Sequence, residues 1–203
     1  MSSFKNNDEG FTGLEAAIVL IAFVVVAAVF SYVVLGAGFF TTQKAQQTVH
    51  TSVEQSSSTL EIVGNVYGTN PNANGASGST ITFVNFSMEL APGGTPIDFS
   101  KVVMVYSNAT TLETLSALSN ASSVTTQPNS AGTWSVTDIQ NPPTAGNASI
   151  LLEPNEQFQV SCRPSNPIYP NDQFTIEVRP AVGAAFSISR TAPAAIYAVN
   201  TLY

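Results

Sequence analysis

The feature that most constrains this chain is an apolar run near its N-terminus. Ala16 to Leu35 provides 20 consecutive residues of which only Ser31 and Tyr32 are polar. An α-helix rises ~1.5 Å per residue, so a run of this length reaches about 30 Å, the thickness of the hydrocarbon core of a bilayer. The run therefore predicts a helix that can span a membrane.

Glu15 is an unusual residue at the start of this run, because it is the one charged residue between Gly10 and Lys44. A carboxylate at membrane depth costs roughly 2.5–3.5 kcal/mol, and an ordinary membrane anchor would omit it. We therefore expect Glu15 to have a partner in the assembled protein. The alternative is that Glu15 only favours the positive end of the helix dipole, which is worth ~0.3–1 kcal/mol.

The residues around Gly10 indicate a processing site. A usual secretory leader is cleaved after its apolar region, whereas Gly10 precedes the apolar run, so cleavage there keeps the helix and leaves Phe11 as the new N-terminus. The sequence Gly-Phe-Thr-x-x-Glu at this point resembles the class III signal of type IV pilins. The wider sequence GFTGLEAAIVLIAFVVVAAVFSYVVLGAGFF, from Gly10 to Phe40, resembles archaellin, the subunit of the archaeal flagellum. Archaellin leaders usually carry Lys or Arg before the glycine, but this one reads Asn-Asn-Asp-Glu.

This resemblance implies a structural filament subunit that polymerises through its N-terminal helix and serves swimming motility. It implies a leader over residues 1–10 removed by a prepilin-type signal peptidase, a membrane and filament-core helix over 11–62, and an extracellular domain over 63–203. The freed α-amino group of Phe11 would then lie one helical turn from Glu15. The implied partners are copies of this chain or other archaellins, and a membrane-embedded assembly platform. The precursor is expected in the cell membrane and the filament on the archaeal cell surface.

Beyond Glu61 the helical periodicity gives way to short alternating runs separated by turn sequences such as NPNANGASGS and NPPTAG. The clearest run, Thr82 to Leu90, places Val84, Phe86, Met88 and Leu90 on one face. Similar patterns occur at Gln157 to Arg163 and around Phe174, Phe186 and Ile196, with weaker runs at 97–106, 134–139 and 150–152. Seven to nine short strands predict an antiparallel sandwich or barrel, and the resemblance implies an immunoglobulin-like sandwich. The fold class is therefore α+β, a long helix followed by a β-domain.

Three glycines are candidate assembly positions on the expected helix: Gly13, Gly36 and Gly38. A glycine weakens a helix in water by ~1 kcal/mol against Ala, but small residues let helices approach closely in membrane bundles. The alternative for Gly36 and Gly38 is a simple kink where the helix leaves the bilayer.

Composition excludes several function classes. The six Lys and Arg residues and a net charge of −7 argue against nucleic acid as a partner. No catalytic residues are assigned, since His50, the only histidine, falls in the polar half of the helix and Cys162 falls on the inward face of a strand. We therefore expect a protein that is not an enzyme and needs no cofactor.

Covalent sugar is the modification that the sequence predicts. Four N-x-[ST] sequons follow the helix, one on a strand and three in turn-like segments: Asn85, Asn108, Asn120 and Asn147. The resemblance to archaellins, which often carry N-linked glycans at such sequons, strengthens this expectation. It also leaves open a calcium site in the loops, for which no ligands can be named.

Two other functions remain open from the residues. A single-pass membrane protein with a receptor or adhesin module accounts for the helix and the β-domain, but not for Glu15 or a leader that ends at Gly10. An adhesive type IV-like pilin shares the processing and the helix bundling. The wording GLEAAIVLIAF is more like archaellin than pilin.

Overall fold

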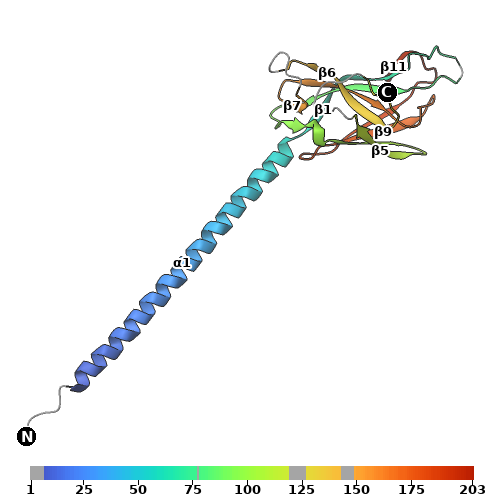
Figure 1. Cartoon of the computed structure of the whole chain (residues 1–203). Helices are drawn as coiled ribbons and strands as arrows, with labels where there is room; N and C mark the ends of the chain where they lie inside the picture. Colours follow the sequence, from blue (N-terminus) through green and yellow to red (C-terminus); the bar gives the residue numbers. More distant parts are fainter. Residues whose placement is uncertain (1–6, 77, 119–126, 143–148) are drawn as a thin grey trace, which may run out of the picture. The chain divides into compact units, whose positions relative to one another are not determined.

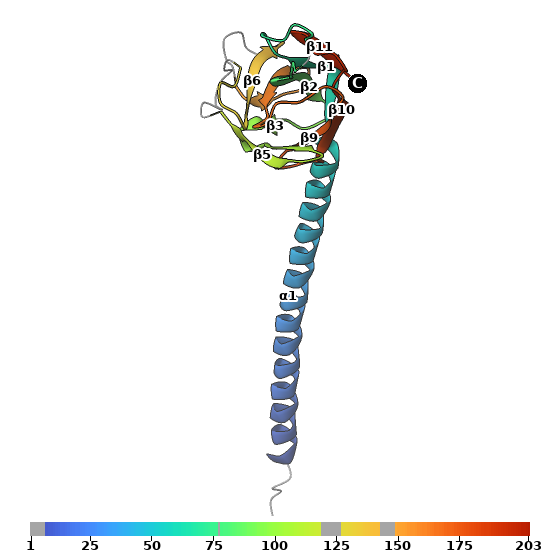
Figure 2. The ribbon, with the colours of Figure 1, turned by 90° about the vertical axis from the view of Figure 1, so that its right-hand side faces the viewer.

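The computed structural model describes residues 7–76, 78–118, 127–142 and 149–203, with side chains from Gly13 onward. The chain divides into two compact units, Met1–Thr51 and Ser52–Tyr203, which are described separately below. Figure 1 shows the chain coloured along its sequence, and Figure 2 gives a second view of the strands.

A single long helix, α1, runs from Asn7 to Ser57. It begins four residues before the expected start at Phe11, since nothing in Asn7-Asp8-Glu9 stops a helix. It ends five residues before the expected boundary at residue 62. The Oγ atoms of Ser57 and Ser58 both donate to the Glu54 carbonyl, 3.2 and 2.8 Å away, and such side chain to backbone bonds compete with continued helix.

The β-domain follows almost at once. Its strands are β1 (Leu60–Thr69), β2 (Phe83–Leu90), β3 (Ile97–Asp98), β4 (Val103–Asn108), β5 (Leu112–Ala117), β6 (Thr133–Gln140), β7 (Leu151–Leu152), β8 (Gln157–Arg163), β9 (Gln173–Arg179), β10 (Phe186–Thr191) and β11 (Val199–Leu202). A short 3₁₀ helix, η1 (Phe99–Lys101), separates β3 from β4.

Nine of these strands form one continuous sheet in the order β10-β9-β4-β5-β6-β8-β2-β1-β11, while β3 and β7 pair separately. All neighbours are antiparallel except β5 and β6, which pair in parallel over two residues, Ser116 with Thr133 and Ala117 with Trp134. The four strands at one end and the five at the other form two facing layers, with β6, β1 and β11 in one and β5 and β9 in the other (Figure 1). The domain is thus a mostly antiparallel sandwich whose layers are joined at β5.

The far ends of the sheet also meet. The backbone N–H of Thr191, at the end of β10, donates to the carbonyl of Tyr203, 2.6 Å away, and the N–H of Tyr203 donates back over 3.4 Å. This pairing links the two edge strands at one point and partly closes the sheet, which shortens the free backbone edges that would otherwise be exposed.

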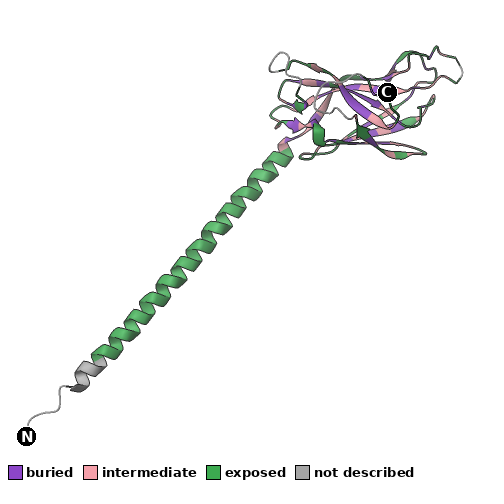
Figure 3. Ribbon diagram, in the orientation of Figure 1, coloured by how far each residue is buried: buried purple, intermediate pink, exposed green. Residues whose placement is uncertain are grey.

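The core lies between the two layers (Figure 3). Residues from both layers meet there, as the thiol of Cys162 on β8 contacts the Met104 sulfur on β4 at 3.7 Å. Phe99 from η1 packs edge-on against Phe158 on β8, with ring centroids 5.0 Å apart. Such aromatic pairs add to the hydrophobic gain from burial.

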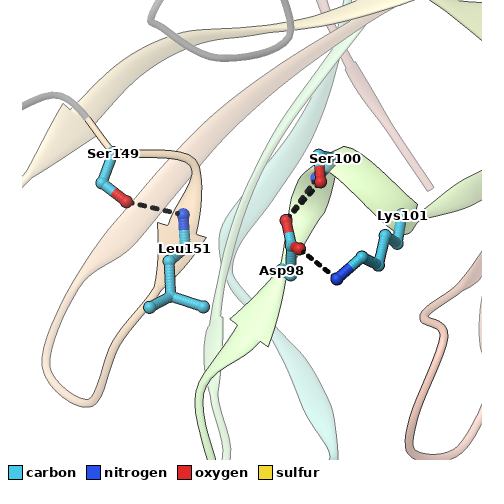
Figure 4. A network of polar contacts seen from close by, with 5 residues as sticks. All are labelled: Asp98, Ser100, Lys101, Ser149 and Leu151. Carbon is cyan, nitrogen blue, oxygen red and sulfur yellow. Dashed lines mark hydrogen bonds and ion pairs between the residues drawn. The ribbon is translucent and has the colours of Figure 1, made fainter.

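Asp98 fixes the start of η1 by accepting hydrogen bonds from Ser100 and pairing with Lys101, whose Nζ lies 2.9 Å from Asp98 Oδ2 (Figure 4). These contacts, with Ser100 first, hold the pKa of the Asp98 carboxyl below its ordinary value. On the paired strand, Ser149 Oγ accepts from the N–H of Leu151 over 3.1 Å. Both sets of bonds stabilise the short strands β3 and β7, which place Phe99 over the core.

The alternating strand patterns are confirmed where they were strongest. In β2 the buried residues are Val84, Phe86, Met88 and Leu90, as expected, and the predicted inward residues of β8 and β9 are also buried, although Ser161 on the other face of β8 is buried as well. The expected strand at 97–106 is interrupted by η1, and the run around Ile196 precedes β11 instead of forming it. Three strands were not predicted, β1, β5 and β11.

Candidate assembly helix and glycosylation sites

From Ala16 to Phe40 the surface of α1 is apolar on nearly all sides, and its large side chains are exposed. Val24 is 60%, Phe30 69% and Tyr32 79% exposed, and none of the residues in its most apolar window, with mean hydropathy 3.0, is buried. A helix that is apolar all round is stable only when other helices or lipid cover it. By length and composition α1 is able to cross a membrane.

The three helix glycines are not needed by the fold of the chain itself. A Cβ built at Gly13, Gly36 or Gly38 meets no atom within 4 Å. Around Gly38 the missing side chain leaves a groove of about 550 Å³ lined by Phe30, Ser31, Val34, Leu35, Gly38, Phe39 and Thr42. A groove with a glycine at its base and aromatic rings at its sides is shaped to receive side chains of another helix.

Beyond Phe40 the helix looks polar in sequence, but its threonines are satisfied within the helix. The hydroxyls of Thr41, Thr42 and Thr51 donate to the carbonyls four residues earlier, at 2.8, 2.9 and 2.9 Å. A hydroxyl already bonded to its own backbone does not require water, and this leaves threonine better suited to a packed interface.

The structure places the remaining predicted positions of the N-terminal region on α1, including Gly10, which was expected to precede the helix. Glu15 is exposed, and Gly10 and Phe11 fall within the helical backbone. His50 is exposed, also on α1.

Asn108 stands at the end of β4 in a compact Asx turn. Its Oδ1 accepts hydrogen bonds from the N–H of Thr110 at 3.0 Å, the Thr110 hydroxyl at 3.1 Å and the N–H of Thr111 at 2.7 Å. Its Nδ2 donates to the Tyr106 hydroxyl over 3.4 Å. Burial in the core raises the pKa of Tyr106 to about 12, so this phenol stays protonated at neutral pH. The sequon Asn-Ala-Thr is therefore a preformed turn in which the Thr hydroxyl contacts the acceptor amide.

Asn85 is held differently. It lies in the middle of β2, between β1 and β8, and its Nδ2 donates to Thr69 Oγ1 on β1 at 3.0 Å. Its amide nitrogen is engaged across the sheet, and the chain on both sides is fixed in the ladder. Asn120 and Asn147 lie outside the described residues.

A polar groove of about 840 Å³ begins at Asn108. One wall is the β4–β5 turn, Ser107 to Thr110, and the other is the segment from Asn166 to Thr175. Asn166 Nδ2 ties the walls together by donating to Thr111 Oγ1 at 3.1 Å. The ring of Tyr169, 55% exposed, lines this groove.

Comparison with known proteins identifies the family. The model of the archaeal-type flagellin family matches residues 10–190. The chain belongs to the archaeal-type flagellin family. Probable flagellin 2 of Archaeoglobus fulgidus is 40% identical over 200 residues, covering 93% of this chain and 92% of the relative. Probable flagellin 1 of the same organism is 58% identical over 101 residues, which is 50% of this chain and 48% of that relative.

Solved structures agree. The archaeal flagellum of Methanospirillum hungatei matches with a TM-score of 0.68 and 32% identity, covering 94% of this chain and 99% of that one. Flagellin FlaB1 from Methanocaldococcus jannaschii has the same fold, at 14% identity and a TM-score of 0.51, over 70% of this chain and 95% of that one. The predicted resemblance to archaellin is confirmed, and the chain is a structural protein of the archaeal flagellum.

In the described part of the flagellin, no three His, Cys, Asp or Glu residues lie close enough together to hold a metal ion. Cys162 is fully buried, and this burial raises the pKa of its thiol far above the ordinary value. A thiol in that state is a packing residue and a poor nucleophile.

Proposed function

We propose that this flagellin polymerises through α1, with copies of the helix packed side by side in the filament core and the sandwich unit facing the medium. The observation that carries the proposal is the exposed apolar surface of α1, which nothing within its own unit covers. Each large side chain transferred out of water gains about 1.5–3 kcal/mol. Summed over the helix this is on the order of tens of kcal/mol per subunit, enough to hold a polymer without disulfides.

The precursor is inserted in the membrane through the same helix, and a prepilin-type peptidase cleaves after Gly10. Lipid tails are as apolar as the helix side chains, so transfer from lipid into the bundle gains little from hydrophobicity and rests on close helix packing. The membrane-embedded assembly platform is the partner for this transfer. N-terminal sequencing of purified filaments should give Phe11; filaments that retain residues 1–10 would contradict the processing step.

Gly38 is the sharpest test of helix packing. Gly38→Leu should fill the groove lined by Phe30 and Phe39 and abolish filaments on the cell surface, as seen by electron microscopy, together with swimming. Gly38→Ala, the matched control, adds one methyl and should retain part of the filament yield. Both variants should keep wild-type helicity in detergent, because a Cβ at this position meets nothing in the chain.

Normal filaments from the Gly38→Leu protein would exclude this face of α1 from the core. Surface filaments that contain the chain but support adhesion without swimming would instead favour a pilin.

We also propose that Asn108 carries an N-linked glycan. In the transfer, Asn108 Nδ2 forms a bond to C1 of a sugar, the bond from C1 to the phosphate of a lipid carrier breaks, and Nδ2 loses a proton. The bond from the Thr110 hydroxyl to Asn108 Oδ1 supports this reaction by fixing the amide in the turn, while Nδ2 has only one long bond to release, the 3.4 Å contact with the Tyr106 hydroxyl. Asn85 should be modified less, because its Nδ2 is bonded across two strands.

Peptide mass mapping tests this. Thr110→Ala should remove sugar from the Asn108 peptide, whereas Thr110→Ser, which keeps the sequon and the hydroxyl, should retain it. An unmodified Asn108 in native filaments would refute the assignment.

A further inference from the structure

The groove beside Asn108 opens next to a potential attachment point, and most of the residues that line it are polar, with Ala109, Pro167 and Phe174 adding apolar surface. Ser107, Thr110, Asn166, Asn171, Asp172 and Gln173 line it together with the Tyr169 ring. Its volume of about 840 Å³ is within the ~300–1,000 Å³ range of sites that bind small molecules.

The wall opposite Asn108 is rigid. Asp172 Oδ2 accepts from the N–H of Tyr169 at 3.0 Å, and the N–H of Asp172 donates back to the Tyr169 carbonyl over 3.2 Å, which closes a tight turn. Within this turn Asn171 adopts a left-handed backbone with φ of 63°. The Asp172 carbonyl accepts from Ala192, 2.9 Å away, so the turn is also fixed to the segment after β10.

The two walls are also held at a fixed separation. Asn166 bonds to Thr111 of the β4–β5 turn, and the N–H of Ser165 donates to Glu113 Oε1 on β5 at 2.8 Å. Below them, Ile168 is fully buried and exchanges backbone bonds of 2.8 and 3.0 Å with Ile81. A groove held in this way loses little conformational entropy when it binds a ligand.

Its chemistry fits a saccharide. A pyranose ring presents C–H groups on its faces, which pack against the electron-rich face of an aromatic ring, and hydroxyls on its rim, which bond to amides and carboxylates. The exposed Tyr169 ring supplies the first surface, and Asn166, Asn171 and Asp172 supply the second. None of the described residues that line the groove is Lys or Arg, so a phosphate or another anion would meet no cation among them.

We propose that this groove cradles the first sugars of the glycan on Asn108, with the Tyr169 ring stacked against one of them. The proposal rests on the glycosylation of Asn108 proposed above. It gives the glycan a structural effect: sugars bound across both walls tie the β4–β5 turn to the Asn166–Thr175 segment and stabilise the sandwich unit.

The test compares the thermal stability of the full chain with and without its glycan, in detergent. The comparison is made once with Tyr169 intact and once in Tyr169→Ala protein. The glycosylated protein is purified from archaeal cells. The same sequence without glycan is produced in bacterial cells that lack the enzyme that transfers sugar to Asn108. Unfolding of the sandwich is followed by the fluorescence of Trp134, the only tryptophan and a buried residue. Peptide mass mapping records sugar on Asn108 in every sample.

With Tyr169 intact, loss of the glycan should lower the midpoint of thermal unfolding by about 2–4 °C. In Tyr169→Ala protein the same loss should have less than half of this effect, and Tyr169→Phe, which keeps the ring, should restore it. Tyr203→Ala is the matched control, since Tyr203 is 80% exposed and does not line the groove. Its dependence on the glycan should equal that of the unaltered chain.

The outcomes separate the two proposals. Absence of sugar on Asn108 overturns the glycosylation and the cradle together. Sugar on Asn108 with the same glycan effect in Tyr169 and Tyr169→Ala proteins overturns the cradle alone and leaves the glycosylation intact.

Discussion

The helix α1 and the sandwich are built from the same apolar residue types but place them in opposite environments. Val24 and Phe30 on α1 are 60% and 69% exposed, whereas Val160 and Phe158 on β8 are fully buried. On the helix the apolar residues are continuous, so every face needs an external partner. On the strands they alternate with polar residues, so one face of each strand can pack against another layer of the same chain. The helix therefore needs other helices or lipid to cover it, whereas the sandwich buries its own core.

The largest effect on filament formation should come from removing α1 from the sandwich. A chain starting at Ser58 should fold into a soluble, β-rich monomer, because the buried core of the sandwich is retained, and it should form no filaments. Circular dichroism and analytical ultracentrifugation check both points. The start should be at Ser58 and not at Gly64, since Leu60 is 1% exposed and pairs with Leu90.

A chain starting at Gly64 provides the control for this boundary, as it lacks the first four residues of β1 and should be clearly less stable. Filaments formed by the Ser58 chain would show that α1 is not the polymer core. An aggregated or helical product would show that the sandwich depends on the helix.

A matched pair of aromatic truncations tests the comparison residue by residue. Phe158→Ala should lower the free energy of unfolding of the sandwich by roughly 3–5 kcal/mol, because it removes a fully buried ring that packs on Phe99. Phe30→Ala should leave that free energy unchanged and instead reduce filament yield. Denaturant titration measures the free energy of unfolding, and quantitative electron microscopy measures filament yield. If Phe158→Ala reduced filament yield without lowering the free energy of unfolding, this prediction would be wrong.

Alkaline pH should act on the sandwich while sparing the helix. Burial raises the pKa of Tyr106 to about 12 from an ordinary value of 10.0. Above pH 10 the unfolded chain loses this proton while the folded chain retains it, so stability is full below pH 10 and falls as pH rises toward 12. At ~1.4 kcal/mol per pKa unit the loss is about 1.4 kcal/mol at pH 11 and approaches about 2–3 kcal/mol above pH 12.

Tyr106→Phe should remove this part of the pH dependence. The comparison is made in a Cys162→Ala background, because the raised pKa of the buried thiol acts in the same direction. Denaturant unfolding at pH 9 and pH 11 measures the difference. Equal losses in the Tyr106 and Tyr106→Phe proteins would assign the alkaline instability to other groups.

The same comparison explains what the sequence could predict. The apolar run of α1 and the alternation in β2, β8 and β9 are local patterns set by burial, and the structure confirms them. β5 was missed because only Leu115 is buried in it, so its six residues show no alternating pattern, and its place depends on pairing with β4 and β6. β1 was missed because it follows the helix directly and is interrupted by a register shift between Val63 and Tyr67.

The candidate sites divide in the same way. The sequon at Asn108 is a local motif, and its Asx turn uses only residues 108–111, so the position was predictable. The groove beside it could not be predicted, since Tyr169 and Asn166 come from a segment more than 50 residues away that reaches Asn108 only through the pairing of β4 with β9. The significance of Gly38 likewise required a structure, because only a built Cβ shows that the chain itself leaves the space empty.

The smallest expected effect concerns Glu15, the one charged residue in the apolar part of α1. Glu15 is therefore the one position in this part of the helix where an ion pair, and not apolar packing, is expected to hold subunits together. If the amino group of Phe11 is freed by cleavage, it lies one turn away and can pair with Glu15 of the same subunit or of a neighbour. Glu15→Gln should leave membrane insertion intact and shorten or reduce filaments, while Glu15→Asp, which keeps the carboxylate, should be milder. The loss per subunit exceeds the ~0.3–1 kcal/mol of a helix dipole only if the pairing exists. Equal filament length and number in the Gln and wild-type strains, measured by electron microscopy, would reduce Glu15 to a dipole contact.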